Sequence, residues 1–269
     1  MAQEATLVTP PGPAGNFGVA VALSSDGSRA LVGASASASA RVFLRTGTAW
    51  AEETSFSGPE LFGTSVALAS DGSRALVGAP GDDLGFVDAG SAAVFLRAGT
   101  VWSTEATIVA PDAFTGDAFG FSVALSSDAS RALVGDYRDD TGPTDAGTAR
   151  VFLRTVTAWA EEAVFTHPSS GNADQMGYSV ALSADGTRAV VGVPNTGIAD
   201  LGSALLYQRS GGVWTEGPTL GAAGPFRPGE TAEIRLRGGL GGARGLLTVF
   251  RVDGEDDPLG RGGRARSTS

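Results

Sequence analysis

Short apolar runs alternate with glycine-containing polar turns along most of the chain, and this arrangement predicts many short β-strands. Typical runs cover residues 19–23, 30–32 and 42–44, which are almost continuously apolar. A strand covered on both faces has this pattern, whereas a strand with one wet face alternates apolar and polar residues. We therefore expect strands that lie inside a stack of sheets.

The stretch from residue 62 to residue 80 recurs, with copies that begin at Phe17, Phe119 and Met176. Each copy runs from a Phe-Gly strand through an Asp-Gly turn to an Arg-Ala-Leu-Val-Gly strand. A variable loop, a Val-Phe-Leu-Arg strand and a Trp-containing strand follow. Such self-similarity is typical of solenoids, propellers and arrays. It predicts an all-β fold, a β-propeller-type array of four four-stranded blades.

The repeats extend over residues 1–220, in units of about 4–50, 51–102, 103–159 and 160–214. Four blades lie at the lower limit of the roughly 4 to 8 that close a propeller, so we expect an incomplete or open array. Residues 221–253 predict a β-hairpin, either a degenerate blade or the start of another β module. Residues 254–269 are rich in Gly, Arg and Ser, which predicts a disordered tail.

The Asp-Gly pairs predict tight hairpins between the first two strands of a unit, because Asp-Gly supplies positive φ angles. They occur within residues 25–28, 70–73 and 184–187. In the third unit Ala129 replaces the glycine. We expect that turn to be strained or of another type.

Composition excludes several functional classes. A net charge of −10 opposes binding to nucleic acid. The chain has no Cys, hence no disulfide or thiolate site, and its one His, His167, rules out a His-cluster metal site and lies outside any Gly-x-Ser-x-Gly elbow. Residues 1–20 lack a signal-peptide pattern, and no apolar segment approaches the roughly 18 residues of a membrane span. We expect neither membrane insertion nor an enzyme.

The motifs Phe-Gly-x-Ser-Val-Ala-Leu, Leu-Val-Gly-Ala-Pro, Gly-Asp-Asp and Asp-Ala-Gly-x-Ala-x-Val-Phe resemble the FG-GAP repeat family, over about residues 4–220. The resemblance implies a β-propeller similar to that of integrin alpha subunits. It also implies an extracellular or cell-surface role in adhesion, with a protein or a glycan as partner. The integrin-type calcium loop has several acidic or amide residues ahead of a Gly. Ser-Ser-Asp-Gly-Ser-Arg has one carboxylate, so we expect that site to be lost.

Two variable loops carry the pattern Asp-Asp-x-x-x-x-Asp-Ala-Gly and form the candidate metal sites. Carboxylates in a glycine-containing loop suit calcium, which prefers several oxygen ligands. The alternative is a solvated loop whose acids cap its own backbone. We favour the alternative, because the fourth unit keeps only Asp200 and the first keeps none. The candidate ligands are Asp82, Asp83 and Asp88 in one loop, and Asp139, Asp140 and Asp145 in the other.

The recurring tryptophans could line a sugar-binding surface, but a Trp on every last strand is more typical of packing against its own sheet and the neighbouring blade. These residues are Trp50, Trp102, Trp159 and Trp214. Arginines that flank the third strands are predicted to solvate an outer edge: Arg41, Arg45, Arg97, Arg150 and Arg154. Two other functions stay open, a hydrolase or lyase with an axial acidic site, and a passive spacer in a larger surface protein.

Overall fold

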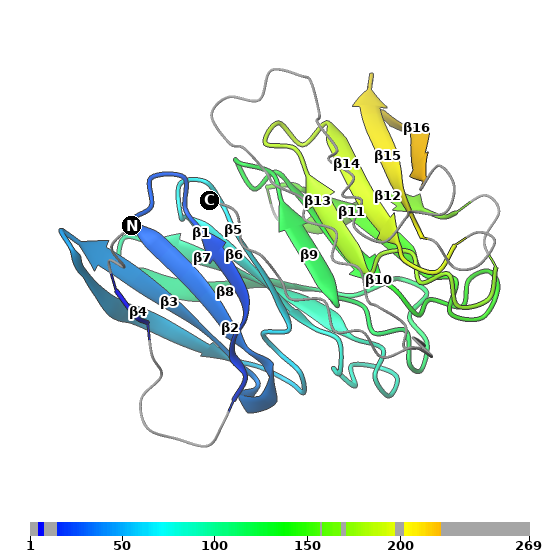
Figure 1. The fold of residues 1–269 in the computed structure, drawn as a ribbon. Coiled ribbons are helices and arrows are strands. Elements are labelled where there is room, and N and C mark those ends of the chain that lie inside the picture. The colour runs from blue at the N-terminus through cyan, green and yellow to red at the C-terminus, as the bar shows by residue number, and fades with distance from the viewer. Residues whose placement is uncertain (1–4, 8–14, 157, 168–170, 197–201, 222–269) are drawn as a thin grey trace, which may run out of the picture. The chain divides into compact units, whose positions relative to one another are not determined.

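The computed structural model describes residues 5–7, 15–156, 158–167, 171–196 and 202–221. In these residues the chain forms four antiparallel sheets of four strands each, and every sheet contains four consecutive strands (Figure 1). This confirms the predicted all-β fold of four four-stranded units. Residues 222–269, with most of the predicted hairpin and the whole predicted tail, lie outside the described residues.

The strands follow the predicted order in each unit. The first sheet consists of β1 (Phe17–Leu23), β2 (Arg29–Ala34), β3 (Ser39–Thr46) and β4 (Ala49–Ser57). The second consists of β5 (Ser65–Leu68), β6 (Arg74–Ala79), β7 (Ser91–Ala98) and β8 (Val101–Ile108). The third consists of β9 (Ser122–Leu125), β10 (Arg131–Asp136), β11 (Thr148–Arg154) and β12 (Trp159–Phe165). The fourth consists of β13 (Ser179–Leu182), β14 (Arg188–Val193), β15 (Ser203–Ser210) and β16 (Val213–Gly221).

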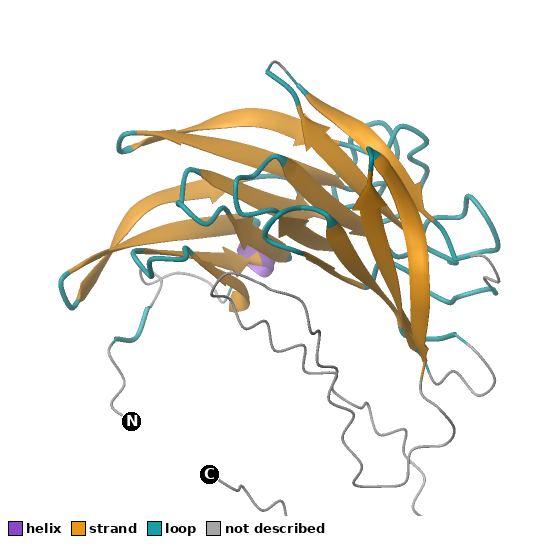
Figure 2. Cartoon of the chain, turned by 90° about the horizontal axis from the view of Figure 1, so that it is seen from above, coloured by secondary structure: helices purple, strands orange, loops and turns teal. Residues whose placement is uncertain are grey.

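Helix is almost absent from the described part of the chain, where one short 3-10 helix, η1 (Ser35–Ser37), interrupts strands and loops (Figure 2). It lies in the variable loop of the first unit. Within the same residues, no helix has the length and apolar character that crossing a bilayer requires.

Apolar side chains fill the spaces between consecutive sheets. Leu31 and Val42 of the first sheet form one core with Val77 of the second, and equivalent cores join the second sheet to the third and the third to the fourth. Phe56 stacks on Phe95 across the first junction, with ring centroids 3.9 Å apart. Burial on both faces explains why β2, β6 and β10 are almost continuously apolar.

In the first three units, the glycine near the end of the second strand lies where two backbones meet, as its position predicts. A Cβ atom at Gly78 would overlap the carbonyl oxygen of Gly120 in the next unit. Gly33 and Gly135 have the same relation to Gly63 and Gly177. Any side chain here would push consecutive sheets apart.

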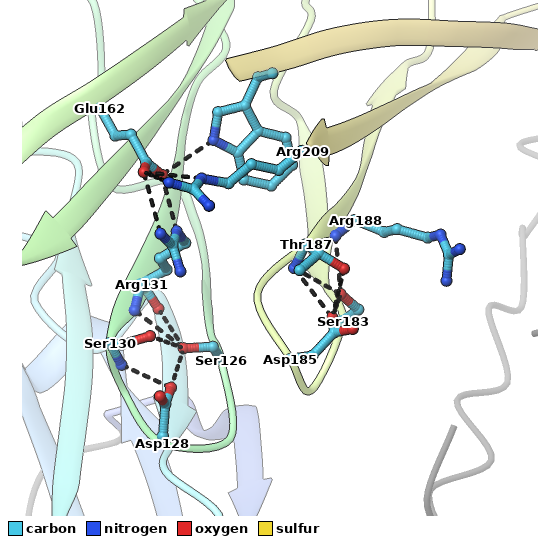
Figure 3. Close-up of polar contacts among 11 residues, drawn as sticks. Ser126, Asp128, Ser130, Arg131, Glu162, Ser183, Asp185, Thr187, Arg188 and Arg209 are labelled. Atoms are coloured by element: carbon cyan, nitrogen blue, oxygen red, sulfur yellow. Dashed lines mark hydrogen bonds and ion pairs between the residues drawn. The ribbon is translucent and has the colours of Figure 1, made fainter. Parts of the chain in front are cut away.

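The hairpin turns differ from the prediction, because only one residue in each has a positive φ and it is not the Asp. The Asp side chain instead accepts a hydrogen bond from the backbone N–H two residues on, as Asp128 and Asp185 do in Figure 3. Ala129 has φ of 48°, so the third turn is of the same type and places a non-glycine residue in the left-handed region. The corresponding glycines have φ of 66° at Gly27, 63° at Gly72 and 64° at Gly186.

The recurring tryptophans at three positions pack against the preceding sheet, as predicted. Trp102 contacts Phe56 edge-on, at 5.6 Å between ring centroids, and its Nε1 donates to Glu53 of the first sheet. Trp214 Nε1 donates to Glu162 of the third sheet at 3.0 Å. Trp159 packs into the core between the second and third sheets. These indoles therefore join consecutive units.

Glu53 and Glu162, which accept from these indoles, also form ion pairs with arginine side chains. Glu162 accepts hydrogen bonds from Arg131 of its own sheet and from Arg209 of the fourth (Figure 3). Burial raises the pKa of Glu162, but hydrogen bonds from Arg131 and Trp214 and the nearby arginine charges outweigh it and lower the pKa to about 2. The ionised Glu thus links two sheets at neutral pH.

We expect Trp102→Ala to lower the free energy of unfolding by about 3 kcal/mol, because it removes a large ring from a sheet junction and a donor from Glu53. Urea unfolding of both proteins measures the change. Trp102→Phe is the matched control, since it keeps most of the packing and should retain more of the stability. An unchanged free energy for Trp102→Ala would contradict the packing role.

Candidate functional site

The variable loops between second and third strands are fixed to the linker of the following unit by backbone hydrogen bonds. The N–H groups of Gly116 and Ala118 donate to the carbonyls of Val87 and Asp88, at 2.9 and 3.0 Å. The next loop repeats the arrangement, where the N–H of Ala173 donates to the carbonyl of Thr144 at 2.8 Å. Each loop is therefore positioned by two units at once.

The predicted acids close their own loops. Asp83 Oδ1 accepts from the N–H of Asp88 at 2.9 Å, and Asp140 Oδ1 accepts from the N–H of Asp145 at 2.6 Å. Asp82 accepts from the hydroxyl of Ser91, which begins β7. The contacts of Asp83 and Asp140 are backbone capping, which is the alternative we favoured, whereas that of Asp82 is with a side-chain hydroxyl. Among the described residues, no three His, Cys, Asp or Glu side chains lie together as metal ligands would. Calcium binding stays a prediction.

Asp139 differs from its counterpart Asp82 because it is buried, with 3% of its surface exposed. Its Oδ1 accepts from the N–H of Thr141 at 2.6 Å. Its Oδ2 accepts from Thr148 Oγ1 at 2.9 Å and from Arg150 at 2.8 Å. Both oxygens are therefore engaged, and these three donors hold the pKa of Asp139 below its usual value although burial raises it.

The prediction that Arg150 solvates an outer edge is wrong. Its side chain is 2% exposed and bonds to Asp139, to Asp112 at 2.7 Å and to Glu161 at 3.1 Å. Arg150 lies on β11, which is an inner strand of the third sheet, and Asp112 of the linker before β9 bonds to it there. Arg41, the counterpart in the first unit, is more exposed and pairs with Glu52.

Asp139 and Asp140 line a hollow in the third unit, together with residues of the linker that precedes β9. We call it the Asp117 hollow; its volume is about 360 Å³ and it is lined by Asp112, Phe114, Asp117, Asp139, Asp140 and Thr141. The linker is held in place by its own acid, since the N–H of Phe114 donates to Asp117 Oδ2 at 2.6 Å. The hollow thus brings together predicted site residues and acids that the sequence reading missed.

Two of the missed acids, Asp117 and Asp136, are buried. Burial and the charges of Asp139, Asp140 and Asp112 raise the pKa of Asp117 to about 6, against a weaker lowering by the N–H of Phe114. Burial, then the charges of Asp139 and Asp117, raise the pKa of Asp136 well above its usual value. Within the described structure, neither carboxyl oxygen of Asp136 has a hydrogen-bond partner.

A comparison of the four copies could have found Asp136. The other units have Ala34, Ala79 and Val193 at this position, all apolar and buried. An Asp at a position that is apolar in the other three units indicates a role other than packing in the core. Asp117 has acidic counterparts in Glu60 and Asp174, so the same comparison would not have separated it from them.

Exposed apolar side chains lie in the two loops next to the Asp117 hollow. The rings of Phe86 and Phe114 contact each other, with centroids 5.6 Å apart, and are 45% and 60% exposed. Leu84 and Val87 of the same variable loop are also exposed. We call these four residues the apolar rim. It borders a hollow lined by acids.

The comparisons with known proteins agree with this fold. Residues 102–152 match the family model of the FG-GAP repeat. The matched segment includes most of β8, all of β9 and β10, and the linker of the Asp117 hollow. No curated protein matches the chain significantly. The FG-GAP resemblance of the third unit is thus confirmed.

Solved structures extend the likeness beyond the matched FG-GAP repeat. Hydrazine synthase of Kuenenia stuttgartiensis is similar with a TM-score of 0.55 and 14% identity, over 82% of this chain and 53% of that one. A candidate 6-phosphogluconolactonase from Bacteroides uniformis gives a TM-score of 0.53 and 11% identity, over 73% and 52%. The chain spans about half the length of both. At this identity the likeness shows a propeller-like fold alone.

Proposed function

We propose that this FG-GAP-like chain is a non-enzymatic interaction module of the extracellular space or cell surface, and that its variable loops bind a protein or a glycan. The observation that carries the proposal is the apolar rim. Contiguous exposed apolar side chains on a soluble domain commonly mark an interaction site, whereas scattered ones need no explanation. The extracellular setting rests on the resemblance to the FG-GAP family.

Anchoring of the loops supports a binding role. Because backbone hydrogen bonds fix the loop of Val87 and Asp88 to the linker of Gly116 and Ala118, Phe86 and Phe114 are presented from a rigid frame. Binding to an ordered loop avoids the entropy cost of ordering it. A passive spacer has no need of such a surface.

An acid-base enzyme is the second candidate, because Asp117 and Asp139 have pKa values that their environments push in opposite directions. Such a pair is the usual sign of an acid and a base. However, both oxygens of Asp139 already accept hydrogen bonds from Thr141, Thr148 and Arg150. A base must be free to accept the substrate proton, so the geometry favours binding over hydrolysis.

The test is selection of ligands from a displayed random-peptide library and a glycan array by the full chain. We expect selected ligands to bind a Phe86→Ser, Phe114→Ser double variant at least about 10-fold more weakly, since the aromatic anchors are lost. The matched control replaces the exposed Val101 and Val213, which lie outside the loops, by Ser. Selection of no ligand, or equal binding to the rim variant, would contradict the proposal.

A further inference from the structure

We propose that a groove between the outer strands of the third and fourth sheets binds a sugar ring of a glycan. We call it the Tyr207 groove; it lies between β12 on one side and β15 and β16 on the other, and its volume is about 470 Å³. Small-molecule sites commonly measure about 300–1,000 Å³. None of the four residues of the apolar rim lines the groove, so this site does not depend on the function proposed for the rim.

Tyr207 is a polar exception in the core of the repeat. The other three units have phenylalanine at this position, at Phe43, Phe95 and Phe152, and all three are buried. Tyr207 is 6% exposed and stacks on Phe165 of the third sheet, with ring centroids 3.9 Å apart. The ring therefore keeps the packing of the repeat, and the hydroxyl group is an addition that this packing does not require.

The hydroxyl group of Tyr207 is poorly satisfied by the protein. In the part of the chain that the structure describes, its one hydrogen bond is to the backbone carbonyl of Thr166, at 3.4 Å. Hydrogen bonds from a hydroxyl to an oxygen normally measure about 2.5–3.0 Å, so this contact is long. Since buried polar groups are normally hydrogen-bonded, a ligand oxygen in the groove would complete the bonding of this residue.

Glu216 supplies an acceptor beside this donor. It lies directly opposite Tyr207 in the β15–β16 pairing, and both residues line the groove. Residues directly opposed on neighbouring strands have their side chains on the same face of the sheet. Glu216 is exposed, so its carboxylate is accessible to a ligand. A donor and an acceptor side by side can bind two neighbouring hydroxyl groups of a sugar.

The other walls favour a neutral ligand with apolar and polar faces. Glu162 also lines the groove, but Arg131 and Arg209 already pair with its carboxylate (Figure 3). Among the described residues, no three acidic or His side chains converge as metal ligands. Trp214 and the exposed Val213 offer apolar surface. Aromatic and aliphatic walls with a few placed polar groups are typical of small-molecule sites, and a sugar ring has both kinds of surface.

The probes are the methyl glycosides of glucose, galactose, mannose, fucose and N-acetylglucosamine, each titrated into the full chain by calorimetry. We expect at least one of them to bind with a Kd of about 1 mM or below. The glycoside with the lowest Kd is then titrated into the variants.

Tyr207→Phe is the decisive variant, because it removes the hydroxyl group and introduces the residue of the other three units, which the fold already accommodates. We expect it to bind the glycoside about 3- to 10-fold more weakly, since one hydrogen bond is lost. Glu216→Ala should weaken binding by about 10-fold. Tyr178→Phe is the matched control, because Tyr178 is exposed and lies outside the groove, and it should leave the affinity unchanged.

Two results would overturn the assignment of a sugar. One is that no glycoside binds up to about 10 mM, and the other is equal binding to Tyr207→Phe and the unchanged chain. Methylguanidinium that binds through Glu216 while no glycoside binds would make the groove a cation site, and the assignment would fail.

The rim variant separates the groove from the function proposed for the loops. The Phe86→Ser, Phe114→Ser protein should bind the glycoside with unchanged affinity, because neither residue lines the groove. If this variant loses glycoside binding while Tyr207→Phe retains it, the sugar binds at the rim and the groove assignment is wrong. Loss in Tyr207→Phe alone supports the groove, whatever the library selection finds at the rim.

Discussion

Replacing Arg150 by methionine should destabilise the protein by about 3–5 kcal/mol, because the change leaves a buried carboxylate without its counter-charge. Asp139 is 3% exposed and loses the guanidinium that lies 2.8 Å from its Oδ2. Asp112 and Glu161 are more exposed and can be solvated, so most of the loss belongs to Asp139. Urea unfolding with an unchanged m-value would measure it.

Arg41→Met is the matched control for this prediction. Arg41 occupies the same place in the first unit and pairs with Glu52 at 2.7 Å, but both side chains are partly exposed. Exposed pairs contribute about 0–1 kcal/mol. A double variant, Arg150→Met with Asp139→Asn, should recover part of the loss because position 139 then carries no carboxylate that needs a counter-charge. If Arg150→Met cost no more than Arg41→Met, the buried pairing would not matter for stability.

The repeat made the fold predictable. Four copies with one internal order specify four strands per unit, and the structure contains those four sheets. The packing role of Trp102 also followed from recurrence, since a residue present once in each unit must suit the contact between neighbouring units. Residues that recur at the same place in every unit indicate the structure that all units share, and this shared structure can be predicted from one sequence.

Residues that occur in one unit were less predictable. Arg150 resembles Arg41 in sequence, and only the linker carrying Asp112 makes it a buried cation. The conformation of Ala129 was also ambiguous, because its turn could have changed type instead of accepting a positive φ. Burial depends on which distant segments cover a position, and local pattern does not report that.

The acids of the hollow were also only partly predictable from the sequence. Asp139 and Asp140 were identified by their motif, but as ligands for calcium. The two buried acids that the motif did not contain are Asp117, which precedes the β9–β10 hairpin and lines the hollow, and Asp136, which ends that hairpin and is not among the lining residues. Their proximity arises from the β9–β10 pairing, which places Gly135 opposite Ser122. A motif search along the chain does not see this.

Asp136→Ala should stabilise the protein at pH 7 by about 1–3 kcal/mol, because it removes a buried polar group that lacks a partner. Alanine occupies the same position in the first and second units, at Ala34 and Ala79, and is buried there. The change therefore replaces Asp136 by the residue that two other units already have at this position. Chemical unfolding at pH 7 would measure the gain.

The gain should depend on pH with a definite sign. The pKa of Asp136 is raised above the usual 3.8, so between about pH 4 and its folded pKa the folded state holds a proton that the unfolded state has lost. The contribution of this carboxyl group to stability is then greatest at low pH and falls as pH rises, by at most about 1.4 kcal/mol per pH unit for each such group. Asp117, with a pKa of about 6, acts in the same direction.

Asp136→Ala should therefore flatten the decline of stability between about pH 4 and pH 7, with the part due to Asp117 remaining. Asp136→Asn separates charge from polarity. Asp136→Asn should flatten the decline as much as Asp136→Ala does. It should be less stable than Asp136→Ala at every pH, because its amide is still buried without a partner. A loss of stability for Asp136→Ala at pH 7 would mean that the carboxyl group makes a stabilising contact, and the prediction would be wrong.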